Sequence, residues 1–553
     1  METEDRYQSG FSVKGLYAVG LLIMLYLMYS PTFLTDYLMN DERAVVGEAT
    51  PHTLVEALSS YFFLSGRGLL GLYMKWVYDF VGYDTSRIQF VRFINFVSIS
   101  VIAILLMNFL GERMKSRQVA FFVVLFFLSQ NSFQGLMGYS LQLISFSQPA
   151  IWLSLLAFYF YFYLFEKNHI PKYLQAGSVF IILMLAMQSA QTYAFFAVIP
   201  MSYLALTDWK ARKVKVIQFL IISITTFVLC SLIYKLGLNF LQARGGEGYI
   251  QGEQGFKYLY NQPLDVFLLA VNPLAYWSVF KMWAFPFPLQ NIPPLRTLIE
   301  RIMSLFIMLA WLGVVFTSLW VEIKSDIKDG KHEIFLKWLA IACCFGLAAT
   351  LIVADSPVKI IDHRPHNLLV FSGLVIFTGA YSLEVLASRF IFLRSHGMKV
   401  FMGLVVLMTA FGAQAGVLRN IVNIHMKQLD FIRTELLAKD PESYRTVVVI
   451  LPAQNQGCIT EPCGPWFGAP LDSNWHLAWP GTYRYAFSTL GVNPAEKKII
   501  FVNSSADIVS QDETILIDWN VYSITQQMYA DYFRREGYFG SLENLIYSNR
   551  DIK

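Results

Sequence analysis

Long apolar runs recur along most of the chain and alternate with short polar segments. A membrane-crossing helix needs about 20 predominantly apolar residues. Runs of this kind lie at residues 15–34, 89–110, 118–136, 147–166, 173–189, 191–207, 216–236, 302–322, 334–354, 367–387 and 399–418. The pattern therefore predicts a mostly α-helical polytopic membrane protein with about 11 transmembrane helices.

The pattern changes after residue 418. A stretch of helical period at 419–438 is followed by short apolar runs at 446–451, 498–502 and 514–517. Runs of this length are typical of strands. We therefore expect a transmembrane domain at 1–418 and a small α/β domain at 419–553.

Composition narrows the class of protein. Hydrophobic residues make up 55% of the chain and charged residues 15%, against about 25% charged in soluble proteins. This excludes a disordered chain, a coiled coil and an ordinary cytosolic enzyme. The net charge of +4 is too small to indicate a nucleic-acid partner, so we expect none.

The distribution of Lys and Arg predicts the orientation. Loops that an inside N-terminus would make cytoplasmic hold fifteen Lys and Arg residues, whereas the three short loops on the other side hold only Lys359 and Arg364. The positive-inside rule then places the N-terminus inside and the α/β domain outside. Two long outer loops follow, at 35–88 and 237–301.

The first outer loop holds the strongest indication of chemistry. Asp41 and Glu42 lie just beyond the first span, and Leu54 to Phe62 has helical period. The sequence Ser65-Gly66-Arg67-Gly68 breaks that helix, and a second apolar helix runs over 69–80. Neither helix is long enough to span, so both are expected to lie along the outer membrane interface.

An acidic pair beyond the first span, followed by two juxtamembrane helices, resembles the GT-C superfamily of integral-membrane glycosyltransferases. Asn40-Asp41-Glu42 stands where the acidic motif of that family belongs, and Gly66-Arg67-Gly68 is similar to the bacterial branch that glucosylates O-antigens, the type II glucosyltransferases. The resemblance implies a polyprenyl-phosphate-linked sugar donor, a glycan, lipid or protein acceptor, contact with membrane lipids, and a bacterial inner membrane with the active site on the periplasmic face.

Transfer at a sugar C1 needs a base for the acceptor hydroxyl, and a carboxylate can take that proton. By the resemblance, Asp41 is the base and Glu42 a supporting acid; the alternative is a solvated loop without function. No cofactor is required, although a divalent cation (Mg²⁺ or Mn²⁺) on these two carboxylates is conceivable.

Cationic side chains on the same side are candidates for binding the donor phosphate, because Arg and Lys suit phosphate oxygens. The short outer loop near 355–367 carries His363, Arg364 and His366. The alternative is that these side chains extend to lipid headgroups and bind no donor. Arg67 is the next candidate, with a salt bridge to Asp79 or Glu56 as the alternative. Lys281 lies in an aromatic stretch of the second outer loop.

Other features keep different functions open. Gln134, Gln148, Gln188 and Gln191 lie within the predicted spans and are uncharged, and we expect no chain of buried charges through the bundle. This expectation argues against a lipid-linked-sugar flippase or other transporter. The loop near 355–367, which we call the arginine–histidine loop, leaves an O-antigen ligase or polymerase as an alternative function. Cys458 and Cys463 could close a disulfide loop in an oxidising compartment.

Overall fold

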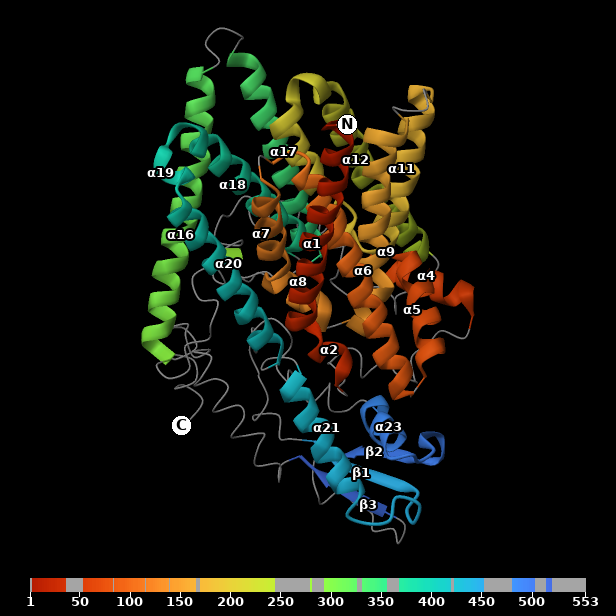
Figure 1. The fold of residues 1–553 in the computed structure, drawn as a ribbon. Coiled ribbons are helices and arrows are strands. Elements are labelled where there is room, and N and C mark those ends of the chain that lie inside the picture. Colours follow the sequence, from red (N-terminus) through yellow and green to blue (C-terminus); the bar gives the residue numbers. More distant parts are fainter. Residues whose placement is uncertain are drawn as a thin grey trace.

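The computed structural model describes residues 2–35, 53–82, 84–114, 116–138, 140–165, 170–243, 279–280, 293–325, 331–355, 368–418, 422–451, 480–502 and 514–519. The described part is mostly helical and contains one small sheet (Figure 1). The sheet lies beyond one end of the helix bundle, which we call the sheet end. The chain starts at the opposite, far end (Figure 1).

The bundle is built from helices that follow the predicted apolar runs. They are α1 (Glu2–Tyr29), α2 (Pro31–Leu34), α4 (Leu54–Ser65), α5 (Gly68–Val81), α6 (Thr85–Gly111), α7 (Arg117–Leu128), α8 (Asn131–Gly138), α9 (Ser140–Tyr159), η1 (Phe160–Leu164), α11 (Lys172–Ser189), η2 (Gln191–Tyr193), α12 (Val198–Ala243), α16 (Pro293–Ser325), α17 (Lys331–Asp355), α18 (Leu369–Arg389), α19 (Ile391–Arg394) and α20 (His396–Val417).

Among the described residues, 6 helices are long and apolar enough to cross a membrane, and Gly15–Tyr29 and Arg117–Leu128 form shorter apolar helices. The chain is therefore a membrane protein by helix length and composition. The predicted number of 11 spans is not confirmed. One reason is that a predicted span can be divided between two elements, as α7 and α8 divide residues 118–136.

One candidate span is much longer than a single crossing requires. Helix α12 has 46 residues, and its backbone leaves helical geometry at Asp208, with φ −123° and ψ 28°. A straight helix of that length would extend about 70 Å, more than twice the thickness of a bilayer core of about 30 Å. The kink thus divides α12 between the two predicted spans at 191–207 and 216–236.

Helix α18 occupies the centre of the bundle, and 67% of its candidate span is buried. Gly373 on α18 allows close packing, since a Cβ there would lie 2.4 Å from Cδ1 of Ile199 and 3.1 Å from Cζ of Phe127. The small residue lets α12 and α7 approach the α18 backbone, as in membrane helix packing generally. By contrast, only 11% of the candidate span of α16 is buried.

The C-terminal part folds as predicted. It contains α21 (Asn423–Leu436), β1 (Thr446–Ile450), α23 (Pro480–Thr489), η8 (Pro494–Glu496), β2 (Lys498–Val502) and β3 (Thr514–Asp518). The strands form a parallel sheet in the order β2-β1-β3. The predicted helix and all three predicted strands are confirmed, with bounds that differ by a few residues.

One apolar cluster contains residues of both this domain and the bundle. Tyr78 and Val81 of α5 and Ile88 of α6 are buried in the same cluster as Ile432 of α21 and Ile517 of β3. Helix α5 therefore connects the membrane bundle to the C-terminal domain.

Candidate functional site

Of the predicted site residues, Arg67 lies within the described part of the structure. The others lie outside the described residues: Asp41, Glu42, Lys281, His363, Arg364, His366, Cys458 and Cys463. The candidate site is therefore built from Arg67 and from the described residues that flank the segments outside the described part.

The chain reverses at the junction of α4 and α5, as the sequence predicts. Gly66 has a φ of 76°, a conformation that glycine adopts without steric penalty. Its N–H donates to the carbonyl of Phe62 at 2.7 Å and so closes α4. Arg67 directly precedes α5, with φ −122° and ψ 62°. The junction thus turns the chain between two short antiparallel helices.

The side chain of Arg67 is partly buried where α4 and α5 meet the rest of the bundle. Its Nη2 donates to Oε1 of Gln191 on η2 at 3.5 Å. Burial lowers the pKa of Arg67 to about 10, and the electrostatic influence of Tyr193 and Tyr234 opposes that shift. Arg67 is therefore a cation at neutral pH, placed beside two tyrosines.

A second glutamine fixes the junction against α11. Oε1 of Gln188 accepts a hydrogen bond from the N–H of Gly68 at 3.2 Å. A Cβ at Gly68 would lie 3.4 Å from that oxygen and 3.4 Å from the carbonyl of Leu58. Glycine at 68 thus allows the first amide of α5 to reach α11, and the position of Arg67 depends on this contact.

The alternative pairing of Arg67 with Asp79 is wrong. Asp79 forms an ion pair with Lys75, with Nζ 2.9 Å from Oδ2. Sequence reasoning identified Gln188 and Gln191 as polar residues near span ends, but did not connect them to Arg67. It missed Tyr193 and Tyr234 altogether, because a tyrosine in an apolar run has no distinguishing pattern.

Described residues that flank two of the predicted outer segments lie in one apolar cluster. Phe280, which precedes Lys281, is buried in one cluster with Leu368, the first described residue after the loop that holds Arg364. The ring of Phe280 also lies 6.1 Å from that of Trp311 on α16. The neighbours of these two predicted phosphate-binding segments therefore pack together.

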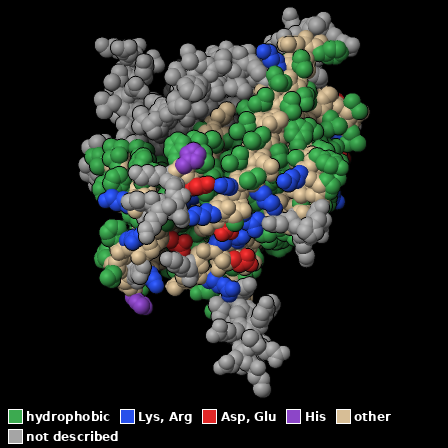
Figure 2. All heavy atoms as spheres, turned by 90° about the horizontal axis from the view of Figure 1, so that it is seen from above, with side chains coloured by type: hydrophobic (Ala, Val, Ile, Leu, Met, Phe, Trp, Pro, Cys, Tyr) green, Lys and Arg blue, Asp and Glu red, His purple; other side chains and the backbone are tan. Residues whose placement is uncertain are grey.

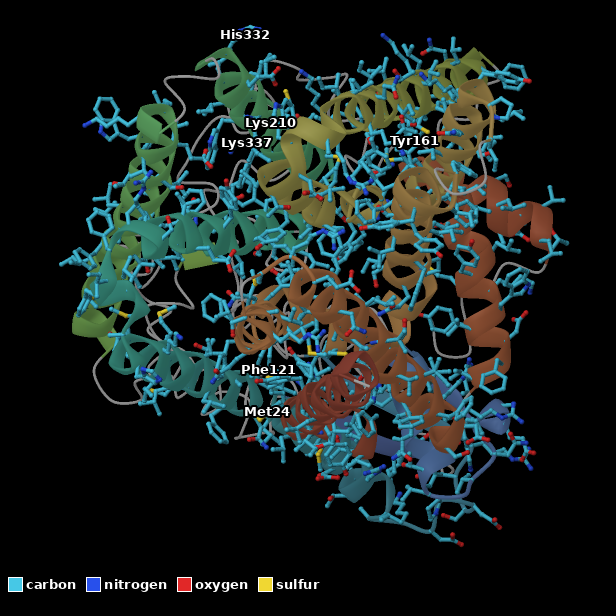
Figure 3. All side chains as sticks on the ribbon, turned by 45° about the horizontal axis from the view of Figure 1, so that its top comes forward. Met24, Phe121, Tyr161, Lys210, His332 and Lys337 are labelled. Atoms are coloured by element: carbon cyan, nitrogen blue, oxygen red, sulfur yellow. The ribbon has the colours of Figure 1, made fainter. Side chains whose placement is uncertain are left out.

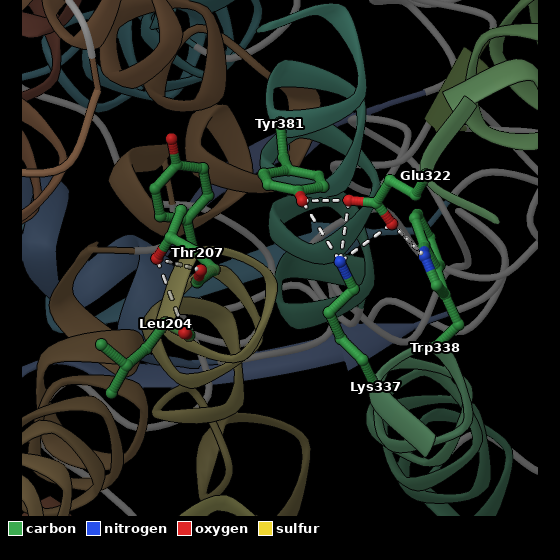
Figure 4. A network of polar contacts seen from close by, with 7 residues as sticks. Leu204, Thr207, Glu322, Lys337, Trp338 and Tyr381 are labelled. Atoms are coloured by element: carbon green, nitrogen blue, oxygen red, sulfur yellow. Dashed lines mark hydrogen bonds and ion pairs between the residues drawn. The ribbon is translucent and has the colours of Figure 1, made fainter. Parts of the chain in front are cut away.

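A separate polar network lies near the far ends of α16, α17 and α18 (Figure 4). Nζ of Lys337 donates to both carboxylate oxygens of Glu322, each at 2.8 Å. Trp338 Nε1 donates to the same carboxylate at 2.9 Å, and the Tyr381 hydroxyl donates to it as well. This network ties three helices together at one carboxylate.

Some charged side chains are buried within the candidate spans. Lys337 and Glu322 lie in two of the candidate spans, with side chains only 9% and 13% exposed. Arg92 in the candidate span of α6 is also buried. Charge pairing explains how a Glu and a Lys are accommodated there, because it removes most of the cost of burying either alone.

No group of three or more His, Cys, Asp or Glu side chains that could hold a metal ion occurs among the residues described here. Asp41 and Glu42, the predicted pair for a divalent cation, lie outside those residues.

No protein-family model matches this chain, and no curated protein sequence matches it.

Proposed function

We propose that this protein is a GT-C-type glycosyltransferase that moves a sugar from a polyprenyl-phosphate donor to a glycan, lipid or protein acceptor on the outer face of a bacterial inner membrane. Asp41 is the general base and Glu42 its supporting acid. Arg67 binds the donor phosphate together with Lys281, His363, Arg364 and His366.

The observation that carries this proposal is the position of Arg67. A cation lies at the turn between two short helices, partly buried and held by Gln191. A partly desolvated cationic side chain attracts an anion more strongly than an exposed cationic side chain does, because water screens its charge less. The short helices themselves, at 54–65 and 68–81, match the juxtamembrane pair of the resemblance.

The positions of the flanking residues also support it. Thr35 and Thr53 border the segment that holds Asp41 and Glu42, and α2 and α4 both lie in the half of the bundle nearer the sheet (Figure 1). Asp355 is the last residue of α17 and Leu368 directly precedes α18, and these two residues border the arginine–histidine loop. The proposal assigns the base and the phosphate ligands to one side of the molecule.

Chemically, the transfer is a single displacement. The acceptor hydroxyl loses its proton to Asp41 as its oxygen attacks C1, and the C1–phosphate bond breaks with the electron pair leaving on the phosphate oxygen. Cationic side chains stabilise the charge that grows there. One base and one cationic phosphate site are sufficient, and inversion at C1 is the expected outcome.

The test is transfer of radiolabelled sugar from extracted polyprenyl-phosphate sugars to endogenous acceptor in membranes that contain the protein. Asp41→Asn should lower transfer by about 10²–10⁴-fold, the usual contribution of a general base. Arg67→Gln should raise the KM for donor and lower kcat, and Arg67→Lys should recover part of both. Lys75→Gln, the same charge change in the same helix pair, is the matched control.

Survival of transfer in Asp41→Asn and also in Glu42→Gln would contradict the proposed base. A second candidate function, movement of a lipid-linked sugar across the membrane, is favoured by one observation, the burial of Arg92 within a candidate span. If the wild type transfers no sugar from any donor but moves lipid-linked sugar between leaflets of vesicles, that second function replaces the first.

A further inference from the structure

Helix α12 bends at a residue that is neither proline nor glycine. Its backbone leaves helical geometry at Asp208, and the hydroxyl of Thr207 donates back to the carbonyl of Tyr203 at 2.9 Å (Figure 4). A Ser or Thr that bonds the carbonyl one turn earlier often bends a helix. The bend therefore has a local cause in the sequence, and it divides α12 into a first rod before Asp208 and a second rod after it.

The two rods are held differently. Residues 198–206 of the first rod are all buried, and the hydroxyl of Tyr203 donates to Oε2 of Glu384 on α18 at 3.1 Å. In the second rod, large apolar side chains such as Val214 and Leu236 are exposed. The first rod is thus fixed in the core of the bundle, whereas the second rod lies at its edge.

One carboxylate holds the second rod directly after the bend. Glu333, in the first turn of α17, accepts hydrogen bonds from Nε1 of Trp209 at 2.9 Å and from Nζ of Lys213 at 2.6 Å. Trp209 and Lys213 are four residues apart and so lie on one face of the helix. Hydrogen bonds to a charged group are roughly twice as strong as those between neutral groups. Two donors on one carboxylate therefore restrict the tilt of the second rod against α17.

The contact of Glu333 lies at the far end of the bundle. Figure 3 shows His332, which precedes Glu333, and Lys210, which follows Trp209, at that end. Figure 2 views the same end from above, where acidic and basic side chains lie among one another. The side chains of Lys213 and Glu333 are 42% and 30% exposed, so the contact is open to solvent on that side.

The second rod reaches the candidate site at its other end. Tyr234 lies 26 residues after Asp208, which is about 39 Å along a helix. Its ring lies 6.1 Å from that of Phe62, whose carbonyl accepts the N–H of Gly66 at the turn before Arg67. A change of about 5° at the bend would move Tyr234 by about 3 Å. A movement of that size is enough to end the ring contact, which needs centroids within about 7 Å.

We propose that Asp208 is a hinge in α12 and that Glu333 sets its angle, so that a carboxylate at the far end positions Tyr234 beside the Arg67 turn. Packed helices can slide by small shear movements, so the apolar packing of the second rod permits the change in angle that Glu333 opposes. Glu333 is a positioning residue in this role and acts through the second rod. The inference does not rest on the proposed function, because it concerns the contacts of α12.

The test measures the distance between two spin labels in the full-length protein in nanodiscs by pulsed electron paramagnetic resonance. The labels are placed at Leu236 on the second rod and at Leu105 on α6, both exposed, after the five cysteines are replaced by alanine. We expect one narrow distance distribution with Glu333 present. Glu333→Leu should broaden it or shift its mean by about 3 Å or more, because both donors lose their acceptor. Glu333→Gln should lie between the two, because its amide oxygen still accepts a hydrogen bond.

Glu112→Gln is the matched control for Glu333→Gln. It removes one carboxylate charge from the same end, where the side chain of Glu112 is 61% exposed, and it should leave the distance distribution unchanged. A second label pair, at Leu105 and at Leu156 on α9, should not respond to Glu333→Leu. An unchanged distance for the first pair in Glu333→Leu would overturn the hinge. An equal change in both pairs would overturn it as well, because it would show a loosening of the whole bundle.

Hydrogen exchange of the unlabelled protein with its native cysteines is a second measurement, which needs no label. The amides of residues 207–213 should exchange faster in Glu333→Leu than in the wild type, because the bend is no longer held. The amides of residues 199–205 should exchange equally in both proteins, since the first rod is fixed by its own contacts. Equal exchange of residues 207–213 in the two proteins would contradict the proposal.

A third readout rests on the proposed function. In the transfer assay, Glu333→Leu should raise the KM for donor severalfold with a smaller effect on kcat, and Glu333→Gln should recover part of the loss. A changed distance with an unchanged KM would contradict the positioning of the Arg67 turn by Glu333. Absence of transfer in the wild type would contradict the proposed function, and the distance measurement would still decide the hinge.

Discussion

Nζ of Lys337 on α17 lies 2.8 Å from Oε1 of Glu322 on α16. The pair anchors the far end of the least buried candidate span, because only 11% of that span of α16 is buried in the protein. In the middle of the same helix, Trp311 Nε1 donates to the carbonyl of Val375 on α18 at 2.9 Å. Polar contacts of Glu322 and Trp311 thus hold this weakly buried helix to α17 and α18.

The ion pair predicts an asymmetry between single and double variants. Lys337→Met leaves a buried carboxylate without its cation and should destabilise the protein by about 3–5 kcal/mol. Combining it with Glu322→Leu should restore much of the stability, since the uncompensated charge is then gone. Thermal unfolding in one detergent, followed by size-exclusion chromatography, measures both effects.

Lys213 supplies a matched control for that measurement. Its Nζ lies 2.6 Å from Oε1 of Glu333, but the two side chains are 42% and 30% exposed. Lys213→Met should therefore destabilise the protein much less than Lys337→Met does. Equal destabilisation by the Lys213 and Lys337 variants would show that burial does not set the cost.

The close packing at Gly373 gives a second prediction. Gly373→Ala should destabilise the protein by about 1–3 kcal/mol, because the new methyl group would overlap Ile199 in a well-packed core. Gly346→Ala on α17 is the control, as a Cβ there meets nothing within 4 Å. It should be neutral or stabilise the helix by up to about 1 kcal/mol. Melting temperatures of both variants test the contrast.

The C-terminal domain should lose stability at high pH. The hydroxyl of Tyr444 donates to the carbonyl of Leu436 at 2.8 Å, and burial, aided by Asp440, raises its pKa above the ordinary value. An unfolded tyrosine releases its proton near pH 10, whereas the folded one retains it. The contribution is thus complete below pH 10 and decreases as pH rises further.

Tyr444→Phe separates this residue from other tyrosines. The variant should be less stable at pH 8 by about 1 kcal/mol, the usual value of one hydrogen bond. Between pH 9 and 11 its stability should decrease less than that of the wild type. Parallel pH dependence in the two proteins, measured by thermal unfolding, would exclude Tyr444 as the titrating group.

Gln188 should position Arg67 without contacting substrate. Gln188→Leu removes the acceptor of the Gly68 amide and should raise the KM for donor in the transfer assay, whereas Gln188→Glu retains an acceptor oxygen and should remain closer to wild type. Gln175→Leu on the same helix is the control, because its Nε2 donates to the carbonyl of Ile170 away from the junction. A change in kcat alone would argue against positioning of a donor ligand.

The sequence predicted elements whose pattern is local. The three strands, α21 and the break at Gly66 and Arg67 are confirmed, since strand length, helical period and a glycine turn depend on nearby residues. The two apolar runs at 191–207 and 216–236 predicted two spans with a loop between them, whereas the structure has one helix that is kinked at Asp208. The number of spans was not settled in this way, because hydropathy alone does not show where a helix such as α7 ends.

The sequence did not predict which side chains from distant segments contact each other. Nothing in the apolar run that holds Tyr234 indicates that it lies near Arg67, and the pairing of Glu322 with Lys337 depends on how α16 and α17 pack. Glu322 and Lys337 lie within two of the predicted spans, but the period of a helix does not reveal which polar side chain points into the bundle. Asp41, Glu42 and the arginine–histidine loop stay predictions.

Helix α5 has Arg67 immediately before its first residue, and near its other end Tyr78 and Val81 lie in the apolar cluster of the C-terminal domain. Its 14 residues extend about 20 Å, and a helix of that length transmits displacement as a rigid rod. A force on the domain, such as the pull of a bound polymer, would therefore reach the Arg67 junction through α5, and it would act on α6 as well, because Ile88 of α6 lies in the same cluster.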